Sequence, residues 1–257
     1  MSEVLVCYAV PMDSDRQPSD DGVEAPDHAL IFWHDHCVAS LIALLQDSGI
    51  EVVSCGEPET NVTAVLAAVE GADDLAVIVV FGHGECPPGP KRVWNRKREP
   101  RSILATEDVV RAAASSGQVF LACFSMAHFR DDASAGGVPA FVGFSEKPWP
   151  PSVAGDFEDV FDEDQQQDLI ARHRQLFVDL VAAFVESADA CRGDHAAMAR
   201  EWNRLVEHCR QQLAEAAEEC LRLFYDTRNP HYFAQREAFL NNARILECLP
   251  RVATGGT

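Results

Sequence analysis

Two apolar runs constrain the fold of this chain more than any other feature. Leu75–Phe81 is apolar throughout, and Gln118–Ala122 forms a second, largely apolar run. Runs of this kind, without polar alternation, are typical of parallel strands that are buried on both faces. Shorter strands are expected at Glu3–Val10, Ile50–Ser54 and Pro139–Phe144.

Segments with helical periodicity lie between these strands. Thr60 is expected to cap a helix that runs to Glu70, and Thr106 to cap one that runs through Ala114. A longer helix over residues 29–46 is expected to bury one apolar face, made of Leu30, Trp33, Cys37, Leu41, Leu44 and Leu45. The alternation of strands and helices predicts an α/β fold, with a parallel-rich sheet flanked by helices on both faces.

The last third of the chain changes character. After the loop at Trp149 and an acidic run, the stretch from Gln167 to about Leu249 reads as two or three amphipathic helices. Gly193-Asp194 and Asn229-Pro230 are expected to separate them. We therefore predict a catalytic domain over residues 1–160 and a helical C-terminal extension over 161–257, packed on or beside it.

Composition limits the partners and the compartment. The formal net charge of −20 disfavours binding to nucleic acid and to anionic membranes. No window approaches the roughly 18 apolar residues that span a bilayer, and the first residues lack the pattern of a secretory leader. Nine cysteines without a CxxC pair suit a reducing compartment, so a cytoplasmic location is expected. No cofactor fingerprint is present, so no cofactor and no metal are predicted.

Chemistry is expected where the two apolar strands end. The first strand is followed by Gly82-His83-Gly84, and the second by Cys123. The carboxyl ends of parallel strands meet at one edge of a sheet, so His83 and Cys123 are expected to lie near each other.

A cysteine beside a histidine is suited to nucleophilic catalysis. A thiol attacks carbonyl carbons only after losing its proton, which a nearby imidazole can accept and later deliver to a leaving amine. The tetrahedral oxyanion needs backbone N–H donors. Gly84, which has no side chain to block its amide, could supply one, and Cys123 the other.

The motifs FGHGE and LACFS, 40 residues apart, resemble the caspase-like peptidases, and most closely the bacterial CHAT (caspase and HetF-associated) family. The resemblance extends to SILATEDVV at 102–110 and GVPAFVGFS at 137–145, and covers about residues 3–160. It implies a caspase-like sheet with His83 as general base and acid, Cys123 as nucleophile and Gly84 as an oxyanion donor. It also implies an endopeptidase that cuts a specific protein partner, in a bacterial signalling or defence system.

The resemblance also implies that the loop after the strand expected at Pro139–Phe144 lines the substrate groove. Glu146, Trp149, Glu158 and Asp159 lie there. Trp149 could wall a subsite, and Asp156 or Glu158 could bind a basic side chain. The alternative for this stretch is a solvated acidic loop.

Several alternatives remain open. The chain could be a catalytically silent caspase-like module that binds or scaffolds a partner, or a hydrolase of small esters or amides. His34 and Cys37 could share a metal, although a helix surface with Cys37 buried is favoured. His128 is either a loop residue or a contributor to the site, and Ser125 is expected to stabilise the turn around Cys123.

A basic loop follows the histidine. Six of the chain's 21 basic residues fall within positions 91–101, among several prolines. We expect this loop to be exposed, mobile and without regular structure. It could be a plain insertion, a cleavage site, or a segment that docks on an acidic partner or on the acidic run at Asp156–Asp164 and so orders the site. The docking contact is the hypothesis carried forward.

Overall fold

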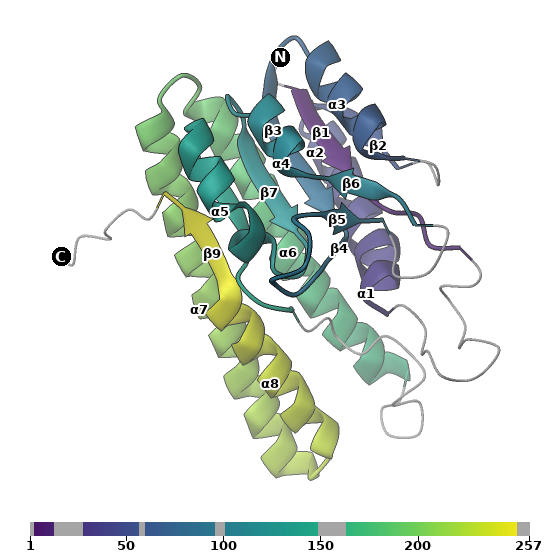
Figure 1. Ribbon diagram of the computed structural model, residues 1–257. Helices are drawn as coiled ribbons and strands as arrows, with labels where there is room; N and C mark the ends of the chain where they lie inside the picture. The colour runs from purple at the N-terminus through teal and green to yellow at the C-terminus, as the bar shows by residue number, and fades with distance from the viewer. Residues whose placement is uncertain (1–2, 13–27, 57–59, 96–100, 149–162, 251–257) are drawn as a thin grey trace.

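The computed structural model describes residues 3–12, 28–56, 60–95, 101–148 and 163–250. Its centre is a six-stranded sheet with the order β2-β1-β3-β7-β8-β9 (Figure 1). The strands are β1 (Glu3–Cys7), β2 (Glu51–Cys55), β3 (Leu75–Phe81), β7 (Gly117–Leu121), β8 (Phe141–Phe144) and β9 (Leu246–Leu249). All neighbours pair in parallel except β8 and β9, which are antiparallel.

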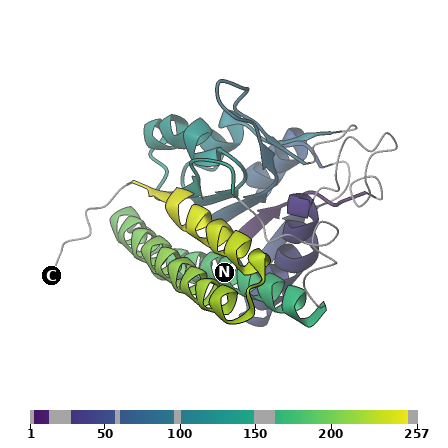
Figure 2. The ribbon, with the colours of Figure 1, turned by 90° about the horizontal axis from the view of Figure 1, so that it is seen from below.

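Helices cover both faces of this sheet, as Figure 2 shows from below. One face carries α3 (Val62–Gly71), α4 (Glu107–Ala112) and α5 (Ser125–Gly136). The other carries α2 (Ala39–Asp47), α6 (Glu163–Ala190) and α7 (His195–Thr227), with α8 (Pro230–Ile245) alongside α7. The predicted α/β fold, with a parallel-rich sheet, flanking helices and a C-terminal helical segment, is confirmed.

The strands β1, β3, β7 and β8 are buried on both faces because their side chains alternate between two cores. In β3, Val77, Val79 and Phe81 pack on the side of α6 and α7, while Ile78 and Val80 pack on the side of α3 and α4. The near-continuous apolar run is therefore required by the central position of this strand.

The N-terminal helix contains a π-helical segment that the sequence did not predict. It runs from α1 (His28–Ile31) through the π segment η2 (Phe32–Val38) into α2. Five of the six residues expected on the buried face are buried, but Leu44 is 38% exposed. The prediction for Leu44 is wrong, because the buried face of α2 is centred on Leu41 and Leu45 and Leu44 lies at its edge.

Helix capping agrees with the sequence at one helix and differs at another. Thr106 caps α4 by accepting a hydrogen bond from the backbone of Asp108. The cap of α3 is Asn61, which accepts hydrogen bonds from the backbones of Thr63 and Ala64. The prediction of Thr60 as this cap is therefore wrong by one residue.

The C-terminal segment belongs to the same core as the sheet. Trp202 of α7 is fully buried, and a β-carbon at Gly117 of β7 would lie 2.4 Å from its ring. After α8 the chain returns as β9, which adds an antiparallel edge strand beside β8. The sequence analysis expected only helices here.

The segment after His83 forms a small second sheet. Its strands are β4 (His83–Gly84), β5 (Val93–Trp94) and β6 (Ile103–Ala105), all antiparallel. The expectation that this basic loop has no regular structure is wrong, because Val93, Leu104 and Ala105 are fully buried and anchor it. Residues 96–100 lie outside the described part. Among the described helices, none combines the length and apolarity that crossing a membrane requires.

Candidate active site

The sheet register brings His83 and Cys123 to equivalent positions. β3 and β7 are parallel neighbours whose last paired residues are Phe81 and Leu121. His83 and Cys123 each follow two residues later, at the carboxyl ends of adjacent strands. The expectation that both residues lie at one edge of one sheet is confirmed.

The backbones of the two segments touch beyond the strand ends. A β-carbon on Gly84 would lie 1.7 Å from the carbonyl oxygen of Cys123 and 3.4 Å from its backbone nitrogen. Only glycine fits this approach without displacing backbone. The two candidate oxyanion donors of the sequence analysis, the N–H groups of Gly84 and Cys123, therefore belong to adjoining backbone segments.

Cys123 lies in a tight turn between β7 and α5. Phe124, the next residue, has φ 56° and ψ 14°, a left-handed conformation that costs about 1–3 kcal/mol when a non-glycine residue adopts it. The turn is held because Ser125 donates a hydrogen bond to the carbonyl of Phe120 at 2.7 Å and accepts one from the backbone of Phe144 at 3.1 Å. These bonds give Ser125 the turn-stabilising position that the sequence analysis expected.

This turn places Cys123 just before the N-terminus of α5, a helix of 12 residues. The positive end of a helix favours negative charge nearby, which helps a thiolate form. Cys123 is partly exposed, in contrast to the five cysteines that are buried, Cys7, Cys37, Cys209, Cys220 and Cys248.

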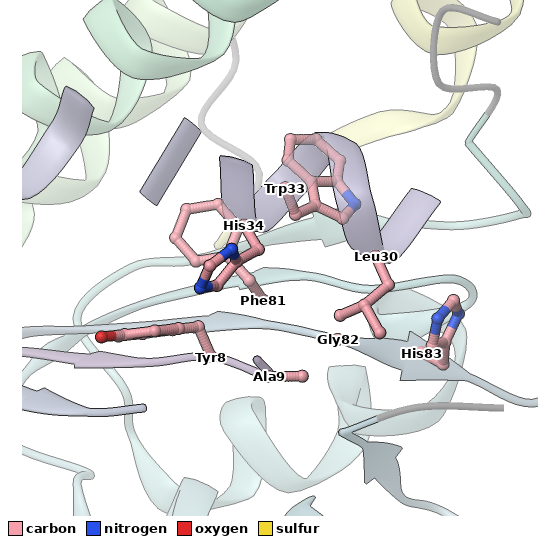
Figure 3. A pocket seen from close by; sticks show the side chains of 8 residues that line it. All are labelled: Tyr8, Ala9, Leu30, Trp33, His34, Phe81, Gly82 and His83. Carbon is pink, nitrogen blue, oxygen red and sulfur yellow. The ribbon is translucent and has the colours of Figure 1, made fainter. Parts of the chain in front are cut away.

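His83 is 7% exposed and borders a narrow hollow that has no room for a water molecule. The hollow is lined by Tyr8, Ala9, Leu30, Trp33, His34, Phe81, Gly82 and His83. Figure 3 shows the imidazole of His83 at one end of it, beside Leu30, and Tyr8 at the other. The walls on one side of His83 are therefore mostly apolar.

His128 fixes the segment that follows Gly84. Its ring Nε2–H donates a hydrogen bond to the carbonyl oxygen of Glu85 at 2.6 Å, and its side chain is buried. The bond joins α5, which begins next to Cys123, to the segment that carries His83 and Gly84. The sequence analysis favoured His128 as a loop residue, whereas it lies in a helix and contacts the site segment.

Trp94 is a site residue that the sequence analysis missed. It is the cross-strand partner of His83 in the small sheet. The guanidinium of Arg101 lies 4.5 Å from the centre of its ring, and that of Arg92 lies 5.7 Å away. An aromatic residue inside a basic stretch was the available signal, because arginines stack readily on indole rings.

The backbone of Glu146 contacts the turn that contains Cys123. Its carbonyl accepts a hydrogen bond from Phe124 N–H at 3.1 Å, next to Cys123. Its exposed carboxylate forms a two-point contact with Arg244 of α8, at 2.6 and 2.7 Å. The hydrogen bonds from Arg244 lower the pKa of Glu146. The other proposed groove residues, Trp149, Asp156, Glu158 and Asp159, lie outside the described residues.

The metal alternative at His34 and Cys37 finds no support in the side-chain arrangement. Cys37 is 1% exposed and burial raises the pKa of its thiol, while His34 contacts Asp35 at 2.7 Å. In the described part of the chain, no three His, Cys, Asp or Glu side chains are grouped to hold a metal ion.

The basic loop docks on an acidic residue of this chain. Lys91 contacts Asp132 of α5 at 2.7 Å, and Arg111 of α4 contacts the same carboxylate at 2.9 Å. Burial by itself would raise the pKa of Asp132, but the hydrogen bonds from Lys91 and Arg111 outweigh this and lower it. The acidic run at Asp156–Asp164, the partner suggested by the sequence, lies largely outside the described residues.

Comparison with protein-family models, with curated proteins and with solved structures found no match to this chain.

Proposed function

We propose that this chain is a cysteine endopeptidase that cleaves a specific protein partner, with Cys123 as nucleophile and His83 as general base and acid. The observation that carries the proposal is the contact between Gly84 and Cys123 at the ends of two adjacent parallel strands. It supports a site in which the thiol of Cys123, the imidazole of His83 and two backbone N–H groups come together at one edge of the sheet. These are the parts that acyl transfer to a cysteine requires.

In the proposed reaction, His83 accepts the thiol proton of Cys123. The thiolate forms a bond to the carbonyl carbon of the scissile peptide, and the carbonyl oxygen becomes an oxyanion that the N–H groups of Gly84 and Cys123 stabilise. When this intermediate collapses, the C–N bond breaks and His83 gives its proton to the leaving amine. Water then attacks the thioester, with His83 as base, which releases the new carboxylate and restores the thiol.

Two further arguments support this assignment. The motifs around His83 and Cys123 resemble those of the CHAT branch of the caspase-like peptidases, and the resemblance favours a protein substrate in a bacterial signalling or defence system. The nine cysteines include no CxxC pair, which suits a reducing compartment, and we propose the cytoplasm as the location of the reaction.

A second candidate function is a catalytically silent module that binds or scaffolds a partner. The burial of His83, at 7% exposure, and the narrow hollow beside it favour this candidate. A peptidase with this geometry has to admit the substrate from the side of Cys123.

Thiol labelling separates the two candidates. In the peptidase, iodoacetamide labels Cys123 quickly. When His83 is replaced by alanine, the labelling rate falls by about tenfold or more at Cys123 and stays the same at the other cysteines, because the imidazole no longer takes the thiol proton. In the silent module, the labelling rate at Cys123 is the same in the wild type and in His83→Ala.

Profiling with a peptide library, using Cys123→Ala as the control, then identifies the residues around the cleaved bond. Cleavage of small esters alone would favour a small-molecule hydrolase.

A further inference from the structure

We propose that Cys7 and Cys55 form a redox-active thiol pair, which a low-molecular-weight disulfide such as glutathione disulfide oxidises to an intramolecular disulfide. The pair lies outside the candidate active site, and the proposal does not depend on the proposed peptidase activity.

The two cysteines are direct partners in the sheet. Cys7 ends β1, Cys55 ends the edge strand β2, and the parallel register sets them opposite each other. Neighbouring strands lie about 4.7–4.9 Å apart, which falls within the Cα separations of about 4.4–6.8 Å found in disulfides. Both side chains lie on the face of the sheet that α3 covers, Cys7 within that core and Cys55 packed against it.

The register and the shared face bring the two thiols close together. At this separation each thiol acts on the pKa of the other through a side-chain hydrogen bond. The backbone is tied at the same point, since Tyr8 N–H donates to the carbonyl of Cys55 at 3.0 Å. This tie keeps the two strand ends together during the reaction.

The pair is asymmetric in the way that thiol–disulfide exchange needs. The hydrogen bond from Cys7 lowers the pKa of Cys55 to about 7, whereas the same bond, together with complete burial, raises the pKa of Cys7. Cys55 is partly exposed and Cys7 is fully buried. Cys55 is therefore the attacking thiolate, and Cys7 is the protected resolving thiol.

The reaction balances with one molecule of glutathione disulfide. The Cys55 thiolate attacks one sulfur of the oxidant, forms a mixed disulfide and releases one glutathione thiolate. Cys7 then loses its proton and attacks the Cys55 sulfur, which releases the second glutathione thiolate and forms the Cys7–Cys55 bond. Two protein thiols are oxidised and the oxidant is reduced to two thiols.

No other described cysteine combines these features. Burial raises the pKa of Cys209 and of Cys248, each to about 12. Cys86 is exposed and serves as a control for access of the oxidant.

The test uses the full chain in glutathione buffers of increasing oxidation, followed by trapping of thiols and peptide mapping by mass spectrometry. We expect a peptide linked through Cys7 and Cys55, while Cys86 is found only as free thiol or bound to glutathione. In Cys7→Ala, Cys55 accumulates as the glutathione adduct, because no resolving thiol remains. The proposal is overturned if the native wild-type chain yields no linked peptide under conditions that modify Cys86.

A second measurement begins with the wild-type chain, so its main result does not depend on the folding of a variant. In the wild-type chain, the alkylation rate of Cys55 should reach half its maximum near pH 7. In Cys7→Ala, the alkylation rate of Cys55 at pH 7 should fall by roughly fivefold. Without the hydrogen bond from Cys7 less of Cys55 is thiolate, and this loss exceeds the gain in the intrinsic nucleophilicity of the thiolate that remains. A wild-type rate at Cys55 that still rises tenfold per pH unit between pH 7 and 8 would count against the attacking role of Cys55.

Discussion

Gly84 lies so close to Cys123 that a β-carbon on the glycine would overlap the cysteine carbonyl oxygen, at 1.7 Å. The neighbouring atoms are backbone, so they cannot move aside as a flexible side chain can. The contact links the turn after β3 to the turn after β7, and these turns carry the two residues of the proposed dyad. Any side chain at position 84 must therefore separate the turns.

Replacing Gly84 by alanine is expected to lower kcat/KM by about 100-fold or more, because a shift of the donor N–H by about 1 Å removes oxyanion stabilisation. Peptide cleavage by purified protein measures the effect. Gly71→Ala is the matched control, since a β-carbon there meets no atom within 4 Å and cleavage should stay near the wild-type rate. Equal values of kcat/KM for the wild type, Gly84→Ala and Gly71→Ala would argue against the Gly84 contact as part of the site.

The variants Cys123→Ala and His83→Ala are each expected to abolish cleavage while the far-ultraviolet circular dichroism stays unchanged. The two side chains act as one unit, so the double variant should be no worse than either single one. Substantial proteolysis by purified Cys123→Ala would assign the nucleophile to another residue.

Replacing His128 by alanine is expected to lower kcat/KM by about tenfold, since the bond that fixes the Glu85 carbonyl is lost. His128→Gln keeps an N–H donor near the same position and should recover part of the loss. If glutamine restores nothing, the histidine contributes through its packing and not through this hydrogen bond.

Stability should depend on pH through Asp132. The bonds from Lys91 and Arg111 hold its pKa below the usual value, so the ionised carboxylate stabilises the folded chain above the unfolded-state pKa, and this contribution is lost as pH falls through the folded-state pKa. Asp132→Asn should lower the free energy of unfolding by about 1–2 kcal/mol at pH 7, given that Lys91 and Arg111 are partly solvent-exposed.

Urea unfolding at pH 7 and at pH 3 measures this effect. The gap between Asp132→Asn and the wild type should be smaller at pH 3 than at pH 7, because below the usual carboxyl pKa the unfolded chain binds a proton at Asp132 that the folded chain holds less tightly. A gap that is equally large at both pH values would show that the charge of Asp132 is not its source.

Trp202→Ala tests whether the C-terminal helices and the sheet fold as one unit. Trp202 is fully buried against Gly117, so its truncation should cost about 3–5 kcal/mol. The loss should appear as one shifted unfolding transition, detected alike by circular dichroism and by the reactivity of buried thiols. Tyr225→Ala, at a residue 58% exposed on the same helix, should change stability by less than about 1 kcal/mol. Two separate transitions would indicate independent units.

Local sequence was sufficient to predict the elements that frame the site. The boundaries of β3 match the apolar run Leu75–Phe81, and α7 begins after the predicted break at Gly193-Asp194. Strand ends determine where His83 and Cys123 lie, because parallel neighbours bring their carboxyl ends to one edge. These inferences depend on periodicity and on glycine, both of which are read along the chain.

The remaining features depend on partners that are distant in sequence. β9 is short and follows a helical stretch directly, so only pairing with β8, about 100 residues earlier, makes it a strand. The bond from His128 to Glu85, the pairing of Cys7 with Cys55 and the contact of Lys91 with Asp132 each span more than 40 residues. Hydrophobic periodicity specifies which side of a helix or strand is buried, but it does not specify which residues that side contacts. Those contacts were decided by the order and register of the strands.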